Sequence, residues 1–91
     1  MPRSSITQLS GVAPGSLFAI TLGAMVREHR KRSGLTQADL ATPATKAFIS
    51  LVERGRTVPS LASLYLIAAR LGIPAWELLD EVNVQMTRDV D

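Results

Sequence analysis

Two short helical patterns lie close together in this 91-residue chain, at Gly34–Ala41 and at Phe48–Gly55. In the first pattern Thr36 is a suitable N-cap, and Asp39 three residues later completes a pair of the capping-box type. Side chains placed in this way satisfy backbone amides that the first turn of a helix leaves unpaired. The pattern therefore predicts a short helix that begins directly after Thr36.

The second pattern begins after Thr45, and its apolar residues Phe48, Ile49 and Val52 recur at helical spacing. Gly55 follows at a position where a left-handed residue commonly ends a helix. Because so few residues join the two helices, the helices have to cross at a steep angle. This is the helix-turn-helix arrangement.

Further helical signals surround this pair. Helices are predicted over residues 16–33, 37–42, 46–54, 61–71 and 74–80. Beyond them, Val82, Val84 and Met86 alternate with polar residues, which is a weak strand signal. We therefore predict an all-α bundle of five helices.

The bundle is expected to occupy residues 16–80. Residues 1–15 are rich in Ser, Gly and Pro and predict a flexible N-terminal arm. Residues 81–91 are expected to form a short C-terminal tail and a candidate dimer contact. The core predicted from helical spacing includes Leu22 and Val26 in the first helix, and Leu61, Leu64 and Ile67 in the fourth.

The net charge of +2 hides an asymmetry along the chain. Residues 1–58 carry eight basic and three acidic residues, whereas residues 59–91 carry two basic and five acidic residues. A basic half that contains the helix-turn-helix favours a polyanionic partner, and an acidic end favours a surface turned away from that partner.

The composition argues against several other classes of protein. There is no cysteine and one histidine, which leaves no thiolate metal site, no nucleophile–base pair and no metal-ligand cluster. We therefore expect no enzyme activity, no cofactor and no metal. The longest apolar run, residues 17–26, is shorter than the roughly 20 residues that span a membrane. We expect a cytoplasmic protein that does not contact membranes.

The motifs occur in an order that resembles the Cro/repressor-type (Xre-type, lambda-repressor-like) DNA-binding domain. The matching stretches are Leu22-Gly23, Val26-Arg27-Glu28-His29-Arg30, Gly34-Leu35-Thr36-Gln37, Ile49-Ser50, Glu53-Arg54-Gly55-Arg56, Pro59-Ser60-Leu61, Ala68, Leu71-Gly72-Ile73 and Glu77-Leu78-Leu79. One such motif alone would be a weak signal, but the ordered series is specific. The resemblance implies that the third helix of a five-helix bundle lies in the major groove of DNA.

On this resemblance the residues that read bases are Lys46, Ala47, Ser50 and Leu51. Lys46 can donate to guanine O6 or N7, or it can hold a phosphate. Ala47 can contact a thymine methyl group, and Ser50 can bond to several bases. For Leu51 partial burial is an equally good interpretation.

The resemblance also implies phosphate contacts by Thr36, Gln37, Arg54, Arg56 and Thr57. Gln37 matches the glutamine that opens the second helix of this family, where it contacts a phosphate and supports the recognition helix. Thr36 and the amides behind it present a helix N-terminus, which suits a phosphate oxygen. Each phosphate contact releases counterions, so affinity should fall steeply with salt.

Other polar and aromatic residues are assigned to structure. Arg30 and Glu53 resemble a pair that joins the first helix to the third in this family, and they hold the recognition helix at its angle. His29 is interpreted as a half-buried packing residue. Tyr65 and Trp76 are interpreted as core or interface aromatics.

The connection between the second and third helices departs from the family pattern. Seven residues, 42–48, separate Leu40-Ala41 from Ile49-Ser50, and they include Pro43 and no glycine. The family normally has a longer connection with a glycine in the turn. Pro43 is expected to end the second helix early.

Two functions remain open at this point. The first is a homodimeric transcriptional regulator, which the family resemblance implies to be a repressor. It would bind double-stranded DNA at a palindromic operator with half-sites about 34 Å apart. The second is a protein-interaction module of antitoxin or regulator-binding type that keeps the helix-turn-helix as a scaffold. The basic half of the chain and the presence of Gln37, Arg54 and Arg56 favour the first.

Overall fold

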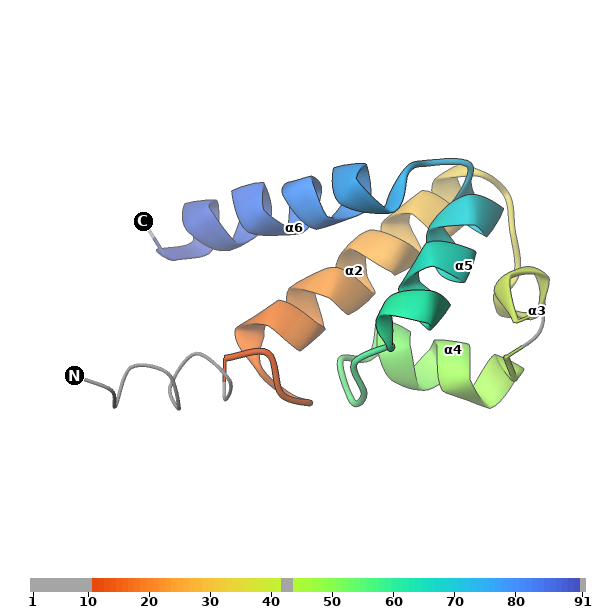
Figure 1. The fold of residues 1–91 in the computed structure, drawn as a ribbon, viewed down its shortest axis with the longest axis horizontal. Coiled ribbons are helices and arrows are strands. Elements are labelled where there is room, and N and C mark those ends of the chain that lie inside the picture. The colour runs from red at the N-terminus through yellow and green to blue at the C-terminus, as the bar shows by residue number, and fades with distance from the viewer. Residues whose placement is uncertain (1–10, 42–43, 91) are drawn as a thin grey trace.

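The structure is a computed structural model that describes residues 11–41 and 44–90. This part of the chain contains five helices and no strand, which confirms the all-α prediction. The helices are α2 (Leu17–Arg32), α3 (Gln37–Leu40), α4 (Lys46–Glu53), α5 (Leu61–Leu71) and α6 (Ala75–Val90). Figure 1 shows α2 between α6 on one side and the group formed by α3, α4 and α5 on the other.

Hydroxyl side chains fix where four of these helices begin. In each case a Ser or Thr in extended conformation accepts a hydrogen bond from the backbone N–H three residues later, which satisfies an otherwise unpaired amide. These caps explain why the observed starts agree with the predicted ones to within one residue. The capping residues are Ser16 for α2, Thr36 for α3, Thr45 for α4 and Ser60 for α5.

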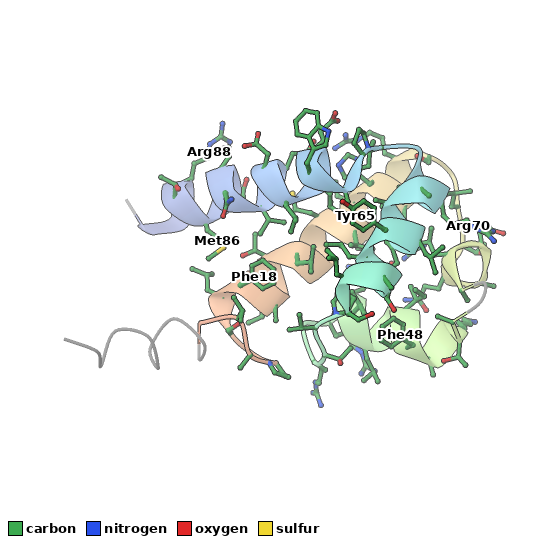
Figure 2. The ribbon with its side chains drawn as sticks, in the orientation of Figure 1. Phe18, Phe48, Tyr65, Arg70, Met86 and Arg88 are labelled. Carbon is green, nitrogen blue, oxygen red and sulfur yellow. The ribbon has the colours of Figure 1, made fainter. Side chains whose placement is uncertain are left out.

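Helix α3 is shorter than the sequence predicted. It ends at Leu40 rather than near Thr42, and residues 42 and 43 lie outside the described part of the chain. Pro43 has no N–H to donate to the carbonyl of Asp39, so a longer helix would lose a hydrogen bond there. That carbonyl instead accepts a bond of 3.4 Å from the Arg70 side chain on α5, which lies beside α3 in Figure 2.

Helix α6 is longer than predicted, and the strand signal after it was wrong. The helix does not end near Asp80 but continues to Val90. Leu78, Val82 and Met86 are four residues apart and therefore share one face of a helix, and the first two are completely buried. The alternation was misleading because this spacing lets the same residues pack along α2. Figure 2 shows Met86 on the side of α6 that faces Phe18 of α2.

The core lies where the helices meet around α2. Its buried members are Leu22, Val26, Leu40, Ala41, Ile49, Leu64, Ile67, Leu71, Leu78 and Val82. Leu61 was expected in this core but is 67% exposed, because it lies on the outer side of the first turn of α5. Tyr65 and Trp76 are also on the surface, 59% and 68% exposed, so they are not core aromatics.

Residues before α2 attach to the loop after α4. The N–H of Gly15 donates to the carbonyl of Gly55 at 2.8 Å. Of the predicted arm, residues 1–10 lie outside the described part of the chain.

Among the described helices, none is by itself long and apolar enough to cross a membrane; α5 and α6 reach the required length and composition only when joined across a 97° bend.

Helices α2 and α4 approach each other closely at Gly23. A Cβ atom added there would lie 2.2 Å from the carbonyl oxygen of Val52 and 2.7 Å from that of Glu53. Both atoms belong to the backbone of α4, which cannot move without shifting the whole helix. A residue without a side chain is therefore required at this crossing.

We predict that Gly23→Ala lowers the free energy of unfolding by roughly 2–3 kcal/mol or more, because the added methyl group forces α2 and α4 apart. Helix propensity alone predicts that the same change raises the free energy of unfolding by about 1 kcal/mol. The sign of the measured change in this free energy therefore distinguishes the two effects. Urea unfolding followed by circular dichroism measures it, with Ala24→Ser at the exposed neighbouring position as the control. A Gly23→Ala protein as stable as the parent would contradict this account of the crossing.

Candidate nucleic-acid interface

The N-terminus of α3 is held by a reciprocal pair of hydrogen bonds. The hydroxyl oxygen of Thr36 accepts from the N–H of Asp39 at 3.1 Å, and the N–H of Thr36 donates to the Asp39 carboxylate at 2.7 Å. The second bond, more than the contact with the Thr36 side chain, lowers the pKa of Asp39 below its usual value. Gln37 directly follows Thr36, so this capping box fixes its position at the start of α3.

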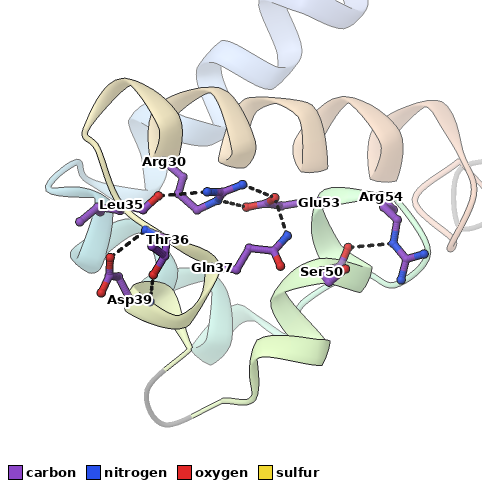
Figure 3. Close-up of polar contacts among 8 residues, drawn as sticks. All are labelled: Arg30, Leu35, Thr36, Gln37, Asp39, Ser50, Glu53 and Arg54. Carbon is purple, nitrogen blue, oxygen red and sulfur yellow. Dashed lines mark hydrogen bonds and ion pairs between the residues drawn. The ribbon is translucent and has the colours of Figure 1, made fainter.

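A buried ion pair joins α2 to α4. The Nε of Arg30 donates to one carboxylate oxygen of Glu53 at 2.6 Å, and Nη2 donates to the other at 3.0 Å. The same guanidinium donates to the carbonyl of Leu35 at 3.0 Å, and Gln37 donates to Glu53 at 3.1 Å. Figure 3 shows this chain of contacts from α2 through Glu53 to the start of α3. The structure thus brings together the pair and the glutamine that the resemblance singled out.

The hydrogen bond to Glu53 raises the pKa of Arg30 above the ordinary arginine value, against the opposing effect of burial. The side chain of Arg30 is therefore a permanent cation, and that of Glu53 is only 3% exposed. A bidentate arginine–carboxylate pair has one favoured geometry. The pair therefore fixes the distance and the angle between α2 and α4.

One face of α4 is open to solvent, and it carries the residues predicted to read bases. Lys46, Ala47 and Leu51 are exposed and Ser50 is partly exposed. Leu51 is 37% exposed, so its side chain is neither in the core nor fully in solvent. The opposite face, which includes Ile49 and Val52, is buried against the bundle. Helical spacing therefore places all four predicted residues on one free surface.

The loop after α4 presents two more cations. Arg54 and Arg56 are exposed, and Thr57 is partly buried. The Nε of Arg54 donates to the carbonyl of Ser50 at 3.4 Å, which directs the guanidinium along the end of α4 (Figure 3). Gly55 between the arginines has a φ of 72° and lies against Ile20 of α2, so this turn favours glycine both for conformation and for space.

A hollow of about 340 Å³ lies between these groups. It is lined by Arg27 from α2, Gln37 from α3 and Ser50, Glu53 and Arg54 from α4 and its end. The sequence prediction included Gln37, Ser50 and Arg54 but missed Arg27. Only the fold shows that this arginine, on a helix outside the motif, lies beside them.

The shortened connection between α3 and α4 leaves the start of α4 well defined. Residues 42 and 43 lie outside the described part of the chain. Directly after them, the hydroxyl oxygen of Thr45 accepts from the N–H of Phe48 at 3.1 Å. Lys46 is therefore the first residue of a capped helix.

On the far side of α2, His29 does more than pack. Its Nε2 lies 2.6 Å from a carboxylate oxygen of Glu81, which connects α2 to α6. Nowhere in residues 11–41 and 44–90 do three or more His, Asp or Glu side chains gather as a metal site would require.

Comparisons with known proteins agree with this geometry. A family profile described as a helix-turn-helix domain matches residues 21–81. An HTH-type transcriptional regulator of Methanothermobacter thermautotrophicus is 46% identical over 50 residues, which are 53% of this chain and 72% of that protein. The regulator DdrOP3 of Deinococcus deserti is 40% identical over 60 residues, 64% of this chain, and the match spans 46% of the length of that protein.

Solved structures give the same result. The clp gene regulator ClgR of Corynebacterium glutamicum superposes with a TM-score of 0.76 and 29% identity, covering 85% of this chain and 84% of that one. The restriction-modification controller protein C.AhdI of Aeromonas hydrophila superposes with a TM-score of 0.64 and 32% identity, covering 66% and 94%.

The fold and the two helices α3 and α4 define a helix-turn-helix DNA-binding protein. The chain belongs to the helix-turn-helix domain family and is a transcriptional regulator of the Cro/repressor type.

We predict that Arg30→Ala and Glu53→Ala each lower the free energy of unfolding by about 3 kcal/mol, because each leaves one buried charge without its partner. The double variant should lower the free energy of unfolding by clearly less than the sum of the two single losses, as expected for residues in contact. Denaturant unfolding of the four proteins measures this.

The matched control is Arg32→Ala, which breaks the exposed pair between Arg32 and Glu28 on the same helix. Because both side chains are more than half exposed, the loss should be about 0.5 kcal/mol or less. Equal losses from Arg30→Ala and Arg32→Ala would show that the buried pair does not support the fold.

Proposed function

We propose that this protein binds double-stranded DNA in a sequence-specific way as a homodimeric repressor, with α4 in the major groove. The observation that carries the proposal is the open face of α4, which lies beside side chains that we propose to bind phosphates. Gln37 and Arg54 both line the same hollow as Ser50, which belongs to this face. A helix flanked in this way can enter a groove while its neighbours hold the backbone.

The first turn of α4 is proposed to distinguish bases. Lys46 would donate to guanine O6 or N7, Ala47 would contact a thymine methyl group, and Ser50 would bond to a base edge. Leu51, further along the helix, would contact the apolar edge of a base or sugar. All four belong to one exposed or partly exposed surface, so they can reach a single groove together.

Positioning on the DNA is proposed to come from side chains that hold phosphates. Arg54 and Arg56 would provide charge, while Thr36, Gln37 and Thr57 would donate hydrogen bonds. Gln37 uses one amide group to donate to Glu53, so a phosphate contact by the same residue would connect the DNA backbone to the buried ion pair.

A second copy of the chain is the proposed partner of α5. The outer side of this helix exposes three large side chains, those of Leu61, Tyr65 and Leu66. Exposed apolar side chains that gather on one surface often mark a contact with another protein. Two copies related by a two-fold axis can cover this surface mutually, and two recognition helices about 34 Å apart would then favour a palindromic operator.

A dimer bound at such a site would exclude other proteins from the same DNA, and this is how we propose that it represses transcription. A DNA partner and a sequence without cysteine both fit a cytoplasmic location.

Titration against a random-sequence DNA pool at two salt concentrations tests the proposal. We expect one family of related sequences to be enriched, and we expect affinity to fall as salt rises. If nothing is enriched and no binding is detected even at low salt, the regulator acts through protein contacts alone. The interaction-module alternative would then describe it better.

Two single variants separate reading from positioning. Lys46→Ala should change the preferred sequence, because Lys46 would contact base edges. Arg56→Ala should weaken binding to all sequences alike. It should also reduce the slope of log affinity against log salt concentration by about 1, because one phosphate contact is lost. Selection from the same pool followed by anisotropy titration measures both, and equal changes in sequence preference would contradict the assigned roles.

Three matched variants locate the proposed dimer contact. Leu61→Glu on α5 should shift the protein from dimer to monomer in analytical ultracentrifugation, because it places a charge in an apolar interface. Leu17→Glu on α2 and Val84→Glu on α6, at other exposed apolar positions, should leave the dimer intact. Val84 lies in residues 81–91, which the sequence analysis gave as a candidate dimer contact. Dissociation by Val84→Glu and not by Leu61→Glu would therefore place the interface on that segment instead of on α5.

A further inference from the structure

We propose that Arg27 and Lys31 on α2 bind backbone phosphates of the DNA, and so extend the contact surface beyond the helix-turn-helix. This inference rests on the proposed DNA-binding function. It assigns a role to a helix face that belongs to neither helix of the motif and that the core does not use. Both side chains are exposed.

The geometry joins this face of α2 to the proposed interface. Arg27 lines the hollow shared with Gln37, Ser50 and Arg54. A second hollow of about 350 Å³ is lined by Arg27 and Lys31 together with Arg54. Arg27 and Arg54 line both hollows, so the cations form one continuous surface from the end of α4 along α2.

The acidic side chains near this surface are already occupied. Glu53 accepts from Arg30 and Gln37, and Glu28 accepts from Arg32 at 2.9 Å. Within residues 11–41 and 44–90, the ion pairs do not include Arg27 or Lys31. Their positive charge is therefore uncompensated there and is available to an anionic partner.

The spacing of the two residues suits a polymer of phosphates better than a single anion. Residues four apart on a helix lie on the same side and are separated by about 6 Å along the axis. A DNA strand carries one charge for about every 3.4 Å of its axis. Side chains as long as arginine and lysine can thus reach neighbouring phosphates of one strand.

The residues that precede these cations leave the surface accessible. Ala24 lies one turn before Arg27, lines the second hollow and is exposed. Its side chain is a single methyl group, so a bulky sugar–phosphate backbone can approach the helix at this point.

The test is the salt dependence of DNA binding by the full chain, with the sequence enriched from the random pool as the probe. Each phosphate contact contributes about 0.9 to the slope of log affinity against log salt. Arg27→Ala should reduce this slope by about 1, and Arg27→Ala with Lys31→Ala by about 2. The preferred sequence should not change, and Arg27→Lys should retain the slope because it keeps the charge.

The matched control is Arg32→Ala. It removes the same charge from the same helix, but Arg32 lines a different hollow, beside Asp80, Glu81 and Arg88 of α6. The slope of log affinity against log salt for Arg32→Ala should equal that of the parent protein. Melting curves of the Arg27 and Lys31 variants should coincide with that of the parent, since the substituted side chains are exposed. Arg32→Ala should melt only slightly earlier, because it breaks an exposed ion pair.

The outcomes are distinct. A parent protein that binds no DNA overturns the proposed function and, with it, this surface. A parent that binds DNA, with Arg27→Ala and Arg32→Ala giving the same slope, overturns the role of α2 alone. A changed sequence preference in Arg27→Ala would show base contact and would also overturn the phosphate assignment.

Discussion

The ion pair between Arg30 and Glu53 is the interaction on which the arrangement of the interface depends. It joins α2 to α4 inside the protein, and its two partners also bond to Leu35 and Gln37, which lead into α3. Because a buried charge without a partner is costly, these helices have one favoured arrangement. The open face of α4, the N-terminus of α3 and the outer face of α2 are all positioned by this network.

Close contact at Gly23 and the charge pair act on the same helix crossing in different ways. The missing side chain lets α2 and α4 approach, and the ion pair then fixes their orientation. The surfaces that result are chemically different. Exposed cations lie along α2 and after α4, whereas apolar side chains lie on the outer side of α5. This separation allows one surface to meet DNA while the other meets a second copy.

Much of the fold could be predicted from local signals, because those signals act over one helical turn. Hydroxyl caps at Thr36, Thr45 and Ser60 gave the starts of helices correctly. Errors arose where the outcome depended on distant packing. Val82 was assigned to a strand pattern because the sequence does not show that α2 buries it, and Leu61 was assigned to the core because the sequence does not show which side of α5 is covered.

The sequence by itself determined the helix-turn-helix, the capped starts and the set of residues on the outer face of α4, since these follow from spacing along a single helix. Only the tertiary structure decided that α6 continues to Val90 along α2, that Gln37 bonds to Glu53 and that Arg27 lines the same hollow as Arg54. Each of these joins residues that are far apart in the chain. Their proximity depends on how the helices cross, and no pattern within one helix records that angle.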